Sequence, residues 1–326
     1  MNDPPGMPFP NDHSGVIHLA GAGGKKPRFV MSALLAVLGR PRPPEVLCLH
    51  LHMSPLAWMV AGRRSRLTAF LHGIEAWRPL AKMERWALTR ADVLIANSEH
   101  TARRFREANP AFASRPIKVC HLGVATRPET AVPLLAQADE RPGSAPFALI
   151  VGRMAADERY KGHDLLIDIW PRIAEEIPEA RLVVAGEGDD RARLENRAVE
   201  SCKGVSFLGH VSDIALEGLY RDCAFFVMPS RNEGFGLVFL EAMRAGKACI
   251  GGVGAAAEVI EDGVTGFVVE PDEPEQVLQA VLRLFREPAT RERMGQAGAL
   301  RLARNFTEEH FRCRFHAILG LGAEPA

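Results

Sequence analysis

The stretch AFFVMPSRNEGFGLVFLEAMRAGKACI, residues 224–250, contains a strand, a turn, a helix and the start of a second strand. Its apolar runs at 224–228 and 248–251 are typical of buried strands. Between them a glycine-rich turn leads into a helical pattern from Leu237, and Gly246 stands where a helix of this length ends. A strand, helix and strand at this spacing predict a βαβ unit in a parallel sheet.

The same alternation covers the rest of the second half. Further strand-like runs lie at 147–151, 181–185, 205–208 and 266–269. Over 163–177 apolar residues recur at helical spacing, and Pro171 is expected to kink or break that helix because proline donates no backbone hydrogen bond. Asp213 is expected to cap the helix that follows it. Strands and helices in this order predict a parallel sheet with helices on both faces.

The first half shows the same pattern less regularly. Its strand candidates are 15–20, 45–51, 66–71, 92–96 and 117–122, and its helix candidates are 29–39, 79–90 and 98–108. Ser98 is a suitable cap for the last of these helices. The proline-rich segment 127–146 is predicted to be a linker.

These patterns predict an α/β protein made of two doubly wound, Rossmann-like domains. We assign residues 1–141 to the first domain and 142–304 to the second, followed by a final amphipathic helix, 305–326, after a turn at Asn305. Ligands of such sheets bind at the carboxyl ends of the strands, so we expect the site in a cleft that both domains face.

The charges are balanced overall but divided unevenly. The 326 residues include 40 Lys and Arg and 40 Asp and Glu, so nucleic acid is not an expected partner. Residues 1–141 hold 19 of the bases and 11 of the acids, which gives +8 there and −8 in the remainder. The asymmetry indicates either different tasks for the halves, including contact of the basic half with an anionic membrane, or an ordinary solvated surface.

The remaining compositional features indicate a cytoplasmic protein. The six cysteines include no C-x-x-C pair and several lie in apolar runs, which predicts reduced, buried thiols. The N-terminal segment is polar and proline-rich, unlike a signal peptide. The apolar segment 29–39 is about half as long as a membrane span, so we expect a buried helix and a soluble or peripheral protein.

The turn of the opening stretch has the features of an anion site. Glycines allow a ligand to approach the backbone, and the first amides of a helix carry partial positive charge, so the amides from Gly234, Phe235, Gly236 and Leu237 are expected to hold a phosphate. Glu233 and Glu241 would repel phosphate, and we expect them to bind vicinal hydroxyls instead. A phosphate flanked by two polyols is a nucleotide sugar; the alternative is a loop with ordinary glutamates.

A second polar loop follows the strand 147–151. Arg153 and Lys161 bracket it, and two cations beside a helix-end phosphate site would neutralise a diphosphate and stabilise its charge as it leaves. Their alternative is a solvated surface loop. The interpretation depends on both loops lying at strand ends of one sheet.

Weaker candidates lie at other strand ends. Gly186, Glu187 and Gly188 form a G-x-G turn. His210 and Val211 follow the next strand, where a base could stack or bind the backbone. His72 and Glu75 follow a strand of the first half. His72 is a candidate for the reacting centre and Glu75 for contact with the acceptor; the alternative for His72 is a histidine in a capped turn. His50 and His52 lack the companion ligands of a metal site, so none is predicted.

Together these segments resemble glycosyltransferase family 4, also called glycosyltransferase group 1. The resemblance rests on VGR…ERYKGHDLLI, LVVAGEGDD, FLGHVSD, PSRNEGFGLVFLEAMRAGKACI and GVTGFVVEPDEPEQVLQAV, and more faintly on LHGIEAW and ADVLIANSEHTARRF. It implies the GT-B fold, a UDP- or GDP-sugar donor, retention at the anomeric carbon, and no cofactor or essential metal. By position, Glu233 would bind the donor sugar, Glu241 the ribose, Arg153 and Lys161 the diphosphate, and His72 would lie near the reacting centre.

The implied reaction is transfer of a hexose to a hydroxyl of a glycan or lipid-linked acceptor in cell-envelope or exopolysaccharide assembly, by front-face attack. The final helix would cross back to the first domain, and the protein would be cytoplasmic or peripheral on the inner membrane face.

Two departures from the family pattern stand out. The first domain is short, with LAGAGGKK (19–26) as the one candidate acceptor loop, and alanines precede Glu258, which is expected to alter the sugar pocket. The alternatives to a glycosyltransferase are a non-catalytic subunit that binds a sugar nucleotide and an epimerase that acts on nucleotide sugars.

Overall fold

The computed structural model describes residues 26–38, 43–126, 145–201 and 204–321. The chain divides into two compact units, residues 1–96 with 104–118 and residues 97–103 with 119–326. The expected boundary at 141/142, most of the linker 127–146, the strand candidate 15–20 and nearly all of the loop 19–26 lie outside the described residues.

The first unit contains most of a small sheet in the order β1-β2-β3-β4, in which β1, β2 and β3 run parallel. Its described elements are α1 (Lys26–Val37), β1 (Glu45–Cys48), η1 (Leu51–Met53), α2 (Ser54–Ala61), β2 (Arg66–Leu71), η2 (Ile74–Ala76), α3 (Lys82–Thr89), β3 (Val93–Ala96) and η3 (Pro110–Phe112). Two elements span the division between units, α4 (Glu99–Ala108) and β4 (Lys118–Val119). Trp58 of α2 packs edge-on against Trp86 of α3 at 4.1 Å, which joins the two helices.

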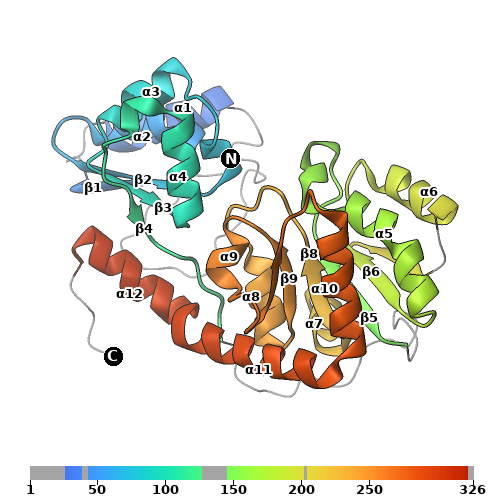
Figure 1. The fold of residues 1–326 in the computed structure, drawn as a ribbon. Coiled ribbons are helices and arrows are strands. Elements are labelled where there is room, and N and C mark those ends of the chain that lie inside the picture. Colours follow the sequence, from blue (N-terminus) through green and yellow to red (C-terminus); the bar gives the residue numbers. More distant parts are fainter. Residues whose placement is uncertain (1–25, 39–42, 127–144, 202–203, 322–326) are drawn as a thin grey trace. The chain divides into compact units, whose positions relative to one another are not determined.

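The second unit contains a six-stranded sheet in the order β10-β9-β8-β5-β6-β7, whose paired strands all run parallel (Figure 1). Its strands are β5 (Phe147–Val151), β6 (Arg181–Ala185), β7 (Val205–Gly209), β8 (Phe225–Met228), β9 (Cys249–Gly252) and β10 (Gly266–Val269). Its helices are η5 (Ala156–Lys161), α5 (His163–Glu176), α6 (Arg191–Ser201), α7 (Asp213–Asp222), α8 (Leu237–Arg244), α9 (Ala256–Val259), α10 (Pro274–Arg286), α11 (Pro288–Asn305) and α12 (Glu308–Leu319).

Helices cover both faces of this sheet, as predicted. Successive side chains of a strand point to opposite faces, and the neighbours Phe225 and Phe226 on β8 show the two layers. Phe225 meets Phe285 of α10 at 4.8 Å, whereas Phe226 meets Phe239 of α8 at 5.4 Å. Because all four residues of β8 are buried, an uninterrupted apolar run rather than an alternating one marks this strand.

The structure tests two predicted helix caps, confirming one and correcting the other. The Ser98 hydroxyl accepts a hydrogen bond from the Thr101 amide, so the predicted cap is confirmed. Asp213 was expected to cap α7, but Ser212 does so through the Ala215 amide, and Asp213 is the first helical residue. An acid in the first turn still favours the positive end of the helix, which explains why Asp213 resembled the cap.

Gly246 ends α8 as predicted. It has a φ of 68°, a left-handed conformation that suits glycine. Its amide bonds the Met243 carbonyl and the Lys247 amide bonds the Ala242 carbonyl, which satisfies two carbonyls at the end of the helix. Pro171, in contrast, does not break its helix, because α5 continues through it to Glu176.

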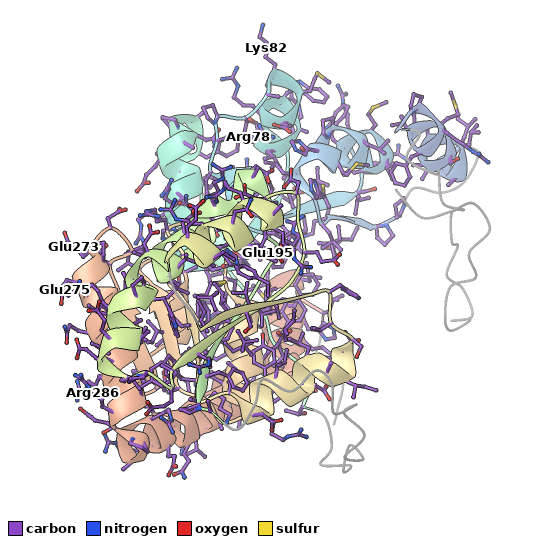
Figure 2. All side chains as sticks on the ribbon, turned by 90° about the vertical axis from the view of Figure 1, so that its right-hand side faces the viewer. Arg78, Lys82, Glu195, Glu273, Glu275 and Arg286 are labelled. Carbon is purple, nitrogen blue, oxygen red and sulfur yellow. The ribbon has the colours of Figure 1, made fainter. Side chains whose placement is uncertain are left out.

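Side chains on α10 tie this helix to α5. Figure 2 shows Glu273 and Glu275 near its start and Arg286 at its end, the arrangement that suits a helix dipole. Glu275 pairs with Arg172 of α5 at 2.8 Å, and Arg286 pairs with Glu176 at the end of α5.

Three further expectations have definite outcomes. Asn305 ends α11, and Thr307 caps α12 through the His310 amide; the crossing of this last helix to the first domain stays a prediction. The described cysteines are free and four are buried, but Cys313 is exposed. The segment 29–39 lies mostly within α1, and it is not fully buried, because Val30, Met31, Leu35 and Leu38 are exposed. None of the described helices combines the length and apolar content needed to cross a membrane.

Candidate active site

The sheet of the second unit reverses its strand order between β5 and β8. These strands are neighbours, but α5 contacts α6 and α10 whereas α8 contacts α7, α9 and α11, so the chain leaves them toward opposite faces. Such a reversal leaves a crevice beyond the carboxyl ends of the two strands, where doubly wound sheets bind ligands. The two motifs that the sequence singled out, at 152–161 and 229–237, follow these two strands.

The loop after β8 folds tightly around glycines. Gly236 has a φ of 91° at the start of α8, and a Cβ there would lie 2.5 Å from the Phe239 ring. The Gly234 amide donates to the Glu233 carboxylate at 3.1 Å. Burial raises the pKa of Glu233, opposed by the Phe235 amide, by Lys161 and by the Gly234 amide. Amides expected to face phosphate therefore contact Glu233 in this structure, and those of Gly236 and Leu237 begin the helix.

The Gly234 peptide is held from its other side. Its carbonyl accepts hydrogen bonds from the hydroxyls of Ser98 at 3.0 Å and Thr101 at 3.3 Å, at the start of α4. Ser98 was predicted to cap a helix, and it also fixes the orientation of this peptide. No local pattern indicates this contact, because 136 positions separate Ser98 from Gly234.

The loop after β5 brings Arg153 and Lys161 to one carboxylate. Lys161 Nζ lies 2.5 Å from Glu158 Oε2, and Arg153 contacts Glu158 Oε1. The side chain of Lys161 is 15% exposed and that of Arg153 is 74% exposed. Lys161 lies over Gly152, where a Cβ would come within 3.3 Å of its Cδ.

The two loops touch each other. The Arg231 amide donates to the Tyr160 carbonyl at 2.9 Å, and a Cβ on Gly162 would lie 2.8 Å from Pro229. Gly162 has a φ of 91°, so glycine satisfies both the turn and the close approach. Lys161 is near enough to Glu233 to lower its pKa against the effect of burial. The structure thus brings three of the four predicted catalytic residues, Arg153, Lys161 and Glu233, to one end of one sheet.

Glu241 has a partner from another helix. Tyr220 of α7 donates its hydroxyl to Glu241 Oε2 at 2.8 Å. Burial and the neighbouring carboxylate raise the pKa of Tyr220 well above its ordinary value, so this phenol remains a donor. One oxygen of Glu241 is therefore held in place, and its predicted contact with ribose stays a prediction.

The G-x-G turn at Gly186 supports the cation loop. A Cβ on Gly186 would lie 2.1 Å from the Gly152 carbonyl oxygen, and the Met154 amide donates to the Glu187 carbonyl at 2.9 Å. Packing between backbones therefore accounts for the glycine. His210 and Val211 follow β7, and ligand contacts of these two residues, Gly186 and Glu187 stay predictions.

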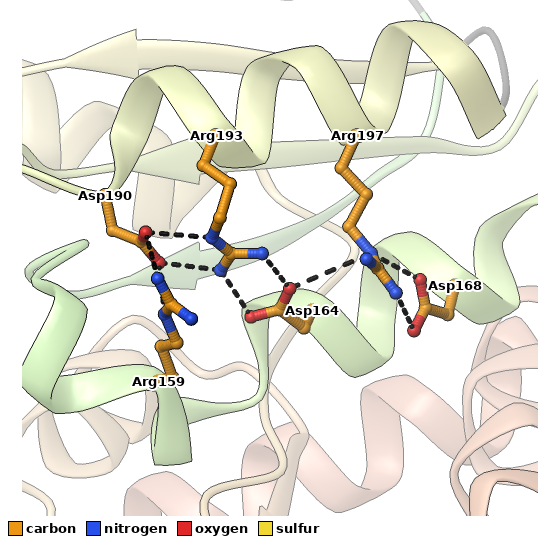
Figure 3. Close-up of polar contacts among 6 residues, drawn as sticks. All are labelled: Arg159, Asp164, Asp168, Asp190, Arg193 and Arg197. Carbon is orange, nitrogen blue, oxygen red and sulfur yellow. Dashed lines mark hydrogen bonds and ion pairs between the residues drawn. The ribbon is translucent and has the colours of Figure 1, made fainter.

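A network of six charged side chains anchors the same loop (Figure 3). Asp190, which is buried, accepts two hydrogen bonds from Arg159 of η5 and two from Arg193 of α6. Arg193 also binds Asp164 of α5 through both oxygens, at 2.6 and 2.8 Å. Outward from it, Arg197 pairs with Asp168 at 2.7 Å. The network fixes η5, the element that carries Glu158 and Lys161.

Glu258, beside the alanine-substituted motif, is fully engaged by the protein. Its carboxylate accepts the Glu99 amide at 2.9 Å, the His100 amide at 2.7 Å and His121 Nε2 at 2.9 Å. Burial would raise the pKa of Glu258, but these hydrogen bonds outweigh it and the pKa is lowered. Glu258 therefore holds the start of α4, whose Ser98 and Thr101 hold Gly234.

In the first unit, His72 and Glu75 form a turn after β2. The His72 amide donates to Glu75 Oε1 at 2.7 Å, and the His72 ring stacks on Phe70 at 4.5 Å. Burial lowers the pKa of His72, against the opposing effect of Glu75. This geometry matches the capped turn that was the alternative for His72, and its place near the reacting centre stays a prediction.

His50 and His52 take part in local contacts. His50 Nδ1 accepts the His52 amide, and His52 Nδ1 lies 2.6 Å from Glu84, which Arg78 also binds. Among the described residues no group of three or more His, Cys, Asp or Glu is placed to hold a metal ion.

Comparison with known proteins identifies the family. Residues 4–127 match the model of Glycosyltransferase Family 4, and residues 145–287 match that of Glycosyl transferases group 1. A GDP-mannose-dependent alpha-(1-6)-phosphatidylinositol monomannoside mannosyltransferase of Mycobacterium tuberculosis is 30% identical over 266 residues, 75% of this chain and 68% of the relative. A GDP-mannose-dependent monoacylated alpha-(1-6)-phosphatidylinositol monomannoside mannosyltransferase of Corynebacterium glutamicum is 29% identical over 267 residues, again 75% of this chain and 68% of the relative. The chain belongs to glycosyltransferase family 4.

Solved structures show that this glycosyltransferase has the GT-B fold. Sucrose-phosphate synthase from Thermosynechococcus elongatus matches with a TM-score of 0.73 at 22% identity, covering 90% of this chain and 77% of the other. Anabaena HepE in complex with UDP and glucose matches with a TM-score of 0.71 at 20% identity, over 90% and 80% of the chains. The enzyme is a hexosyl-type glycosyltransferase that uses a nucleotide sugar.

The site of this glycosyltransferase includes residues for which no role was predicted. Glu158 was detectable in principle, since it lies three positions before Lys161, a spacing at which helical side chains meet. Asp190 precedes a helix and has the position of a capping acid. No local sequence pattern marks Tyr220 or Thr101, because each bonds a residue from a distant segment of the chain.

Proposed function

We propose that the protein is a retaining glycosyltransferase that moves a hexose from a UDP- or GDP-sugar to a hydroxyl of a glycan or lipid-linked acceptor in envelope or exopolysaccharide assembly. One observation carries the proposal: Lys161, which shares the Glu158 carboxylate with Arg153, lies near Glu233 at the strand-order reversal of a parallel sheet. GDP-mannose in the names of the relatives and UDP in the HepE complex support the donor class.

The chemistry follows from charge and position. Arg153 and Lys161 would bind the diphosphate and stabilise the charge that grows on it as the sugar bond breaks. Glu233 would hold sugar hydroxyls, and Glu241, fixed by Tyr220, the ribose diol. The leaving phosphate would take the acceptor proton on the face that it departs from, which retains the anomeric configuration. Catalysis would then rest on orientation and charge stabilisation.

The lipid-linked form of the acceptor has support from two relatives and from the first half of the chain. The two mannosyltransferase relatives are named for phosphatidylinositol mannosides. Residues 1–141 carry an excess of eight basic charges, and three apolar side chains of α1 and that of Leu38 after it are exposed. These features suit contact with an anionic bilayer that presents such an acceptor.

Release of free nucleotide tests the proposal. The purified chain is incubated with UDP- and GDP-hexoses plus a crude lipid extract, and the anomeric configuration of the product is determined by NMR. Wild type is expected to give turnover with an α-linked product from an α-linked donor, unchanged by EDTA. Lys161→Met and Glu233→Gln are expected to lose at least about 100-fold in turnover, because each removes a contact to the reacting group.

Arg172→Met, which removes a surface ion pair of α5, serves as the matched control and should keep full turnover. Normal turnover in both site variants would reject the site. A donor that is bound but never consumed would indicate a binding subunit, and a nucleotide sugar of altered stereochemistry would indicate an epimerase.

A further inference from the structure

Glu158 lies between the two cations of the proposed diphosphate site. Its Oε2 is 2.5 Å from Lys161 Nζ and its Oε1 contacts Arg153. The side chain is only 12% exposed, so this carboxylate is a well-packed part of the site. A carboxylate on a lysine and an arginine has the shape and charge of one phosphate oxygen pair.

The charges of the site cancel while Glu158 stays there. Arg153 and Lys161 supply two positive charges, and Glu158 and Glu233 supply two negative ones. A nucleotide sugar brings one negative charge on each of two phosphates, and it would meet a site without net attraction. Phosphate and the Glu158 carboxylate therefore compete for the same two cations.

The backbone around Glu158 is anchored on both sides. The Ala156 amide donates to Asp189 at 2.9 Å, and Arg159 is bound to buried Asp190 through two hydrogen bonds. Glu158 itself interrupts the helical turns, with φ −116° and ψ 23°. The side chain can therefore leave the cations by rotating about its own bonds, while η5 and Lys161 stay in place. Arg153, which is 74% exposed, is free to follow a ligand.

We propose that Glu158 is a displaceable counter-ion: the diphosphate replaces its carboxylate on Arg153 and Lys161, and Glu158 returns as the nucleoside diphosphate leaves. The inference rests on the proposed function, since it assumes that a diphosphate binds these cations. It assigns Glu158 a role in setting the affinity for the product and the rate of its release. A fixed positioning role would have the opposite consequence, because loss of the carboxylate would then disorder both cations and weaken binding.

Calorimetric titration with UDP and GDP separates the two roles. Glu158→Gln keeps the size of the side chain and removes its charge, so the better of the two nucleotides should bind at least about tenfold tighter than to wild type. Product inhibition should strengthen by a similar factor. Asp157→Asn is the matched control, because Asp157 is the next residue, exposed, and carries the same charge. It should bind like wild type.

Lys161→Met separates this inference from the proposed function. If wild type binds nucleotide and Lys161→Met does not, the diphosphate site stands, and equal or weaker binding by folded Glu158→Gln then overturns the counter-ion role. If Glu158→Gln melts early, Glu158→Ala is titrated instead with the same expectation. If wild type and both Glu158 variants bind neither nucleotide, the proposed function fails and the counter-ion role fails with it.

Discussion

Tyr220 and Glu241 illustrate how a predicted ligand residue depends on a second side chain. Glu241 is proposed to hold ribose, and the Tyr220 hydroxyl fixes one of its oxygens at 2.8 Å. Tyr220→Phe keeps the ring in the core and removes this hydrogen bond, which involves a charged acceptor and contributes about 1.5–3 kcal/mol. We expect UDP or GDP to bind about tenfold more weakly, as measured by calorimetry.

Inorganic pyrophosphate is the internal control for this variant. It has no ribose, so its competition for the donor site should be the same in wild type and in Tyr220→Phe. Equal weakening of nucleotide and pyrophosphate would show that Tyr220 acts on the whole loop, and the ribose assignment of Glu241 would be wrong.

His163 makes stability depend on pH. It is buried, its Nε2 has no hydrogen-bond partner among the described residues, and burial lowers its pKa to about 4, with Lys161 contributing. The unfolded chain binds this proton near pH 6.5, so stability is complete above that pH and falls as the pH drops toward 4. At pH 5 the loss amounts to about 2 kcal/mol.

Urea unfolding of wild type and His163→Phe at pH 7.5 and pH 5.0 measures this effect. Phenylalanine fills a similar volume and does not titrate, so the variant should lose about 2 kcal/mol less between the two pH values. The same loss in both proteins would mean that other groups cause the acid sensitivity.

The sequence indicated the residues with unusual local chemistry and not their partners. Glu233, Arg153 and Lys161 follow strands in glycine-rich or polar loops, and this pattern is visible in a single sequence. No role was predicted for Glu158, because nothing in a sequence tells how far a side chain is buried between two cations. Ser98 was recognised for its local cap, while its bond to Gly234 depends on tertiary packing.

The β5–α5 loop owes its shape to Asp190. This buried carboxylate holds Arg159 of η5 and Arg193 of α6, whose side chains are 52% and 34% exposed. Hydrogen bonds to a charged group contribute about 1.5–3 kcal/mol, and the exposed arginines would be solvated once the carboxylate is gone. Asp190→Asn should therefore lower the free energy of unfolding by about that amount in urea titration. It should also weaken UDP or GDP binding, because Lys161 lies on the same loop.

Asp168→Asn provides the comparison within the same network. Its pair with Arg197 is solvent-exposed, so the change should cost less than about 1 kcal/mol. Arg193 and then Arg159 hold the pKa of Asp190 well below its usual value, and this stabilisation is present above about pH 4 and lost as the pH falls through the folded pKa. A similar loss of unfolding free energy in Asp190→Asn and Asp168→Asn would contradict the expectation that the buried carboxylate contributes more than the exposed one.

The elements of the second unit were predictable because their signals are local and repeated. Each strand is a short apolar run, and each is followed by a turn and a helical pattern. An error arose where two residues compete for one position, as with Ser212 and Asp213. At Pro171 the helix continues, so a break is excluded and a kink stays a prediction. The strand order, and with it the reversal between β5 and β8, comes from packing that one sequence does not display.

The apolar residues of α1 bear on how the protein meets its acceptor. A buried helix was expected, yet Val30, Met31, Leu35 and Leu38 are exposed. Exposed Arg28 precedes them, and Arg63 and Arg64 follow α2 in the same unit. Apolar side chains next to basic ones suit the interface of an anionic bilayer, where each base contributes about 1 kcal/mol.

Vesicle sedimentation tests whether the whole protein binds such a surface. The chain is expected to pellet with vesicles that contain anionic lipid, to pellet less as salt rises, and to stay in solution with neutral vesicles. Arg63→Glu with Arg64→Glu should reduce pelleting, because four units of charge change in the unit that contains α1, whereas Arg312→Glu on α12 should not. Equal pelleting on neutral and anionic vesicles would exclude an electrostatic contact. Unchanged pelleting of the double variant would place the contact elsewhere on the chain, and the acceptor would then have to reach the enzyme by a route that does not involve this unit.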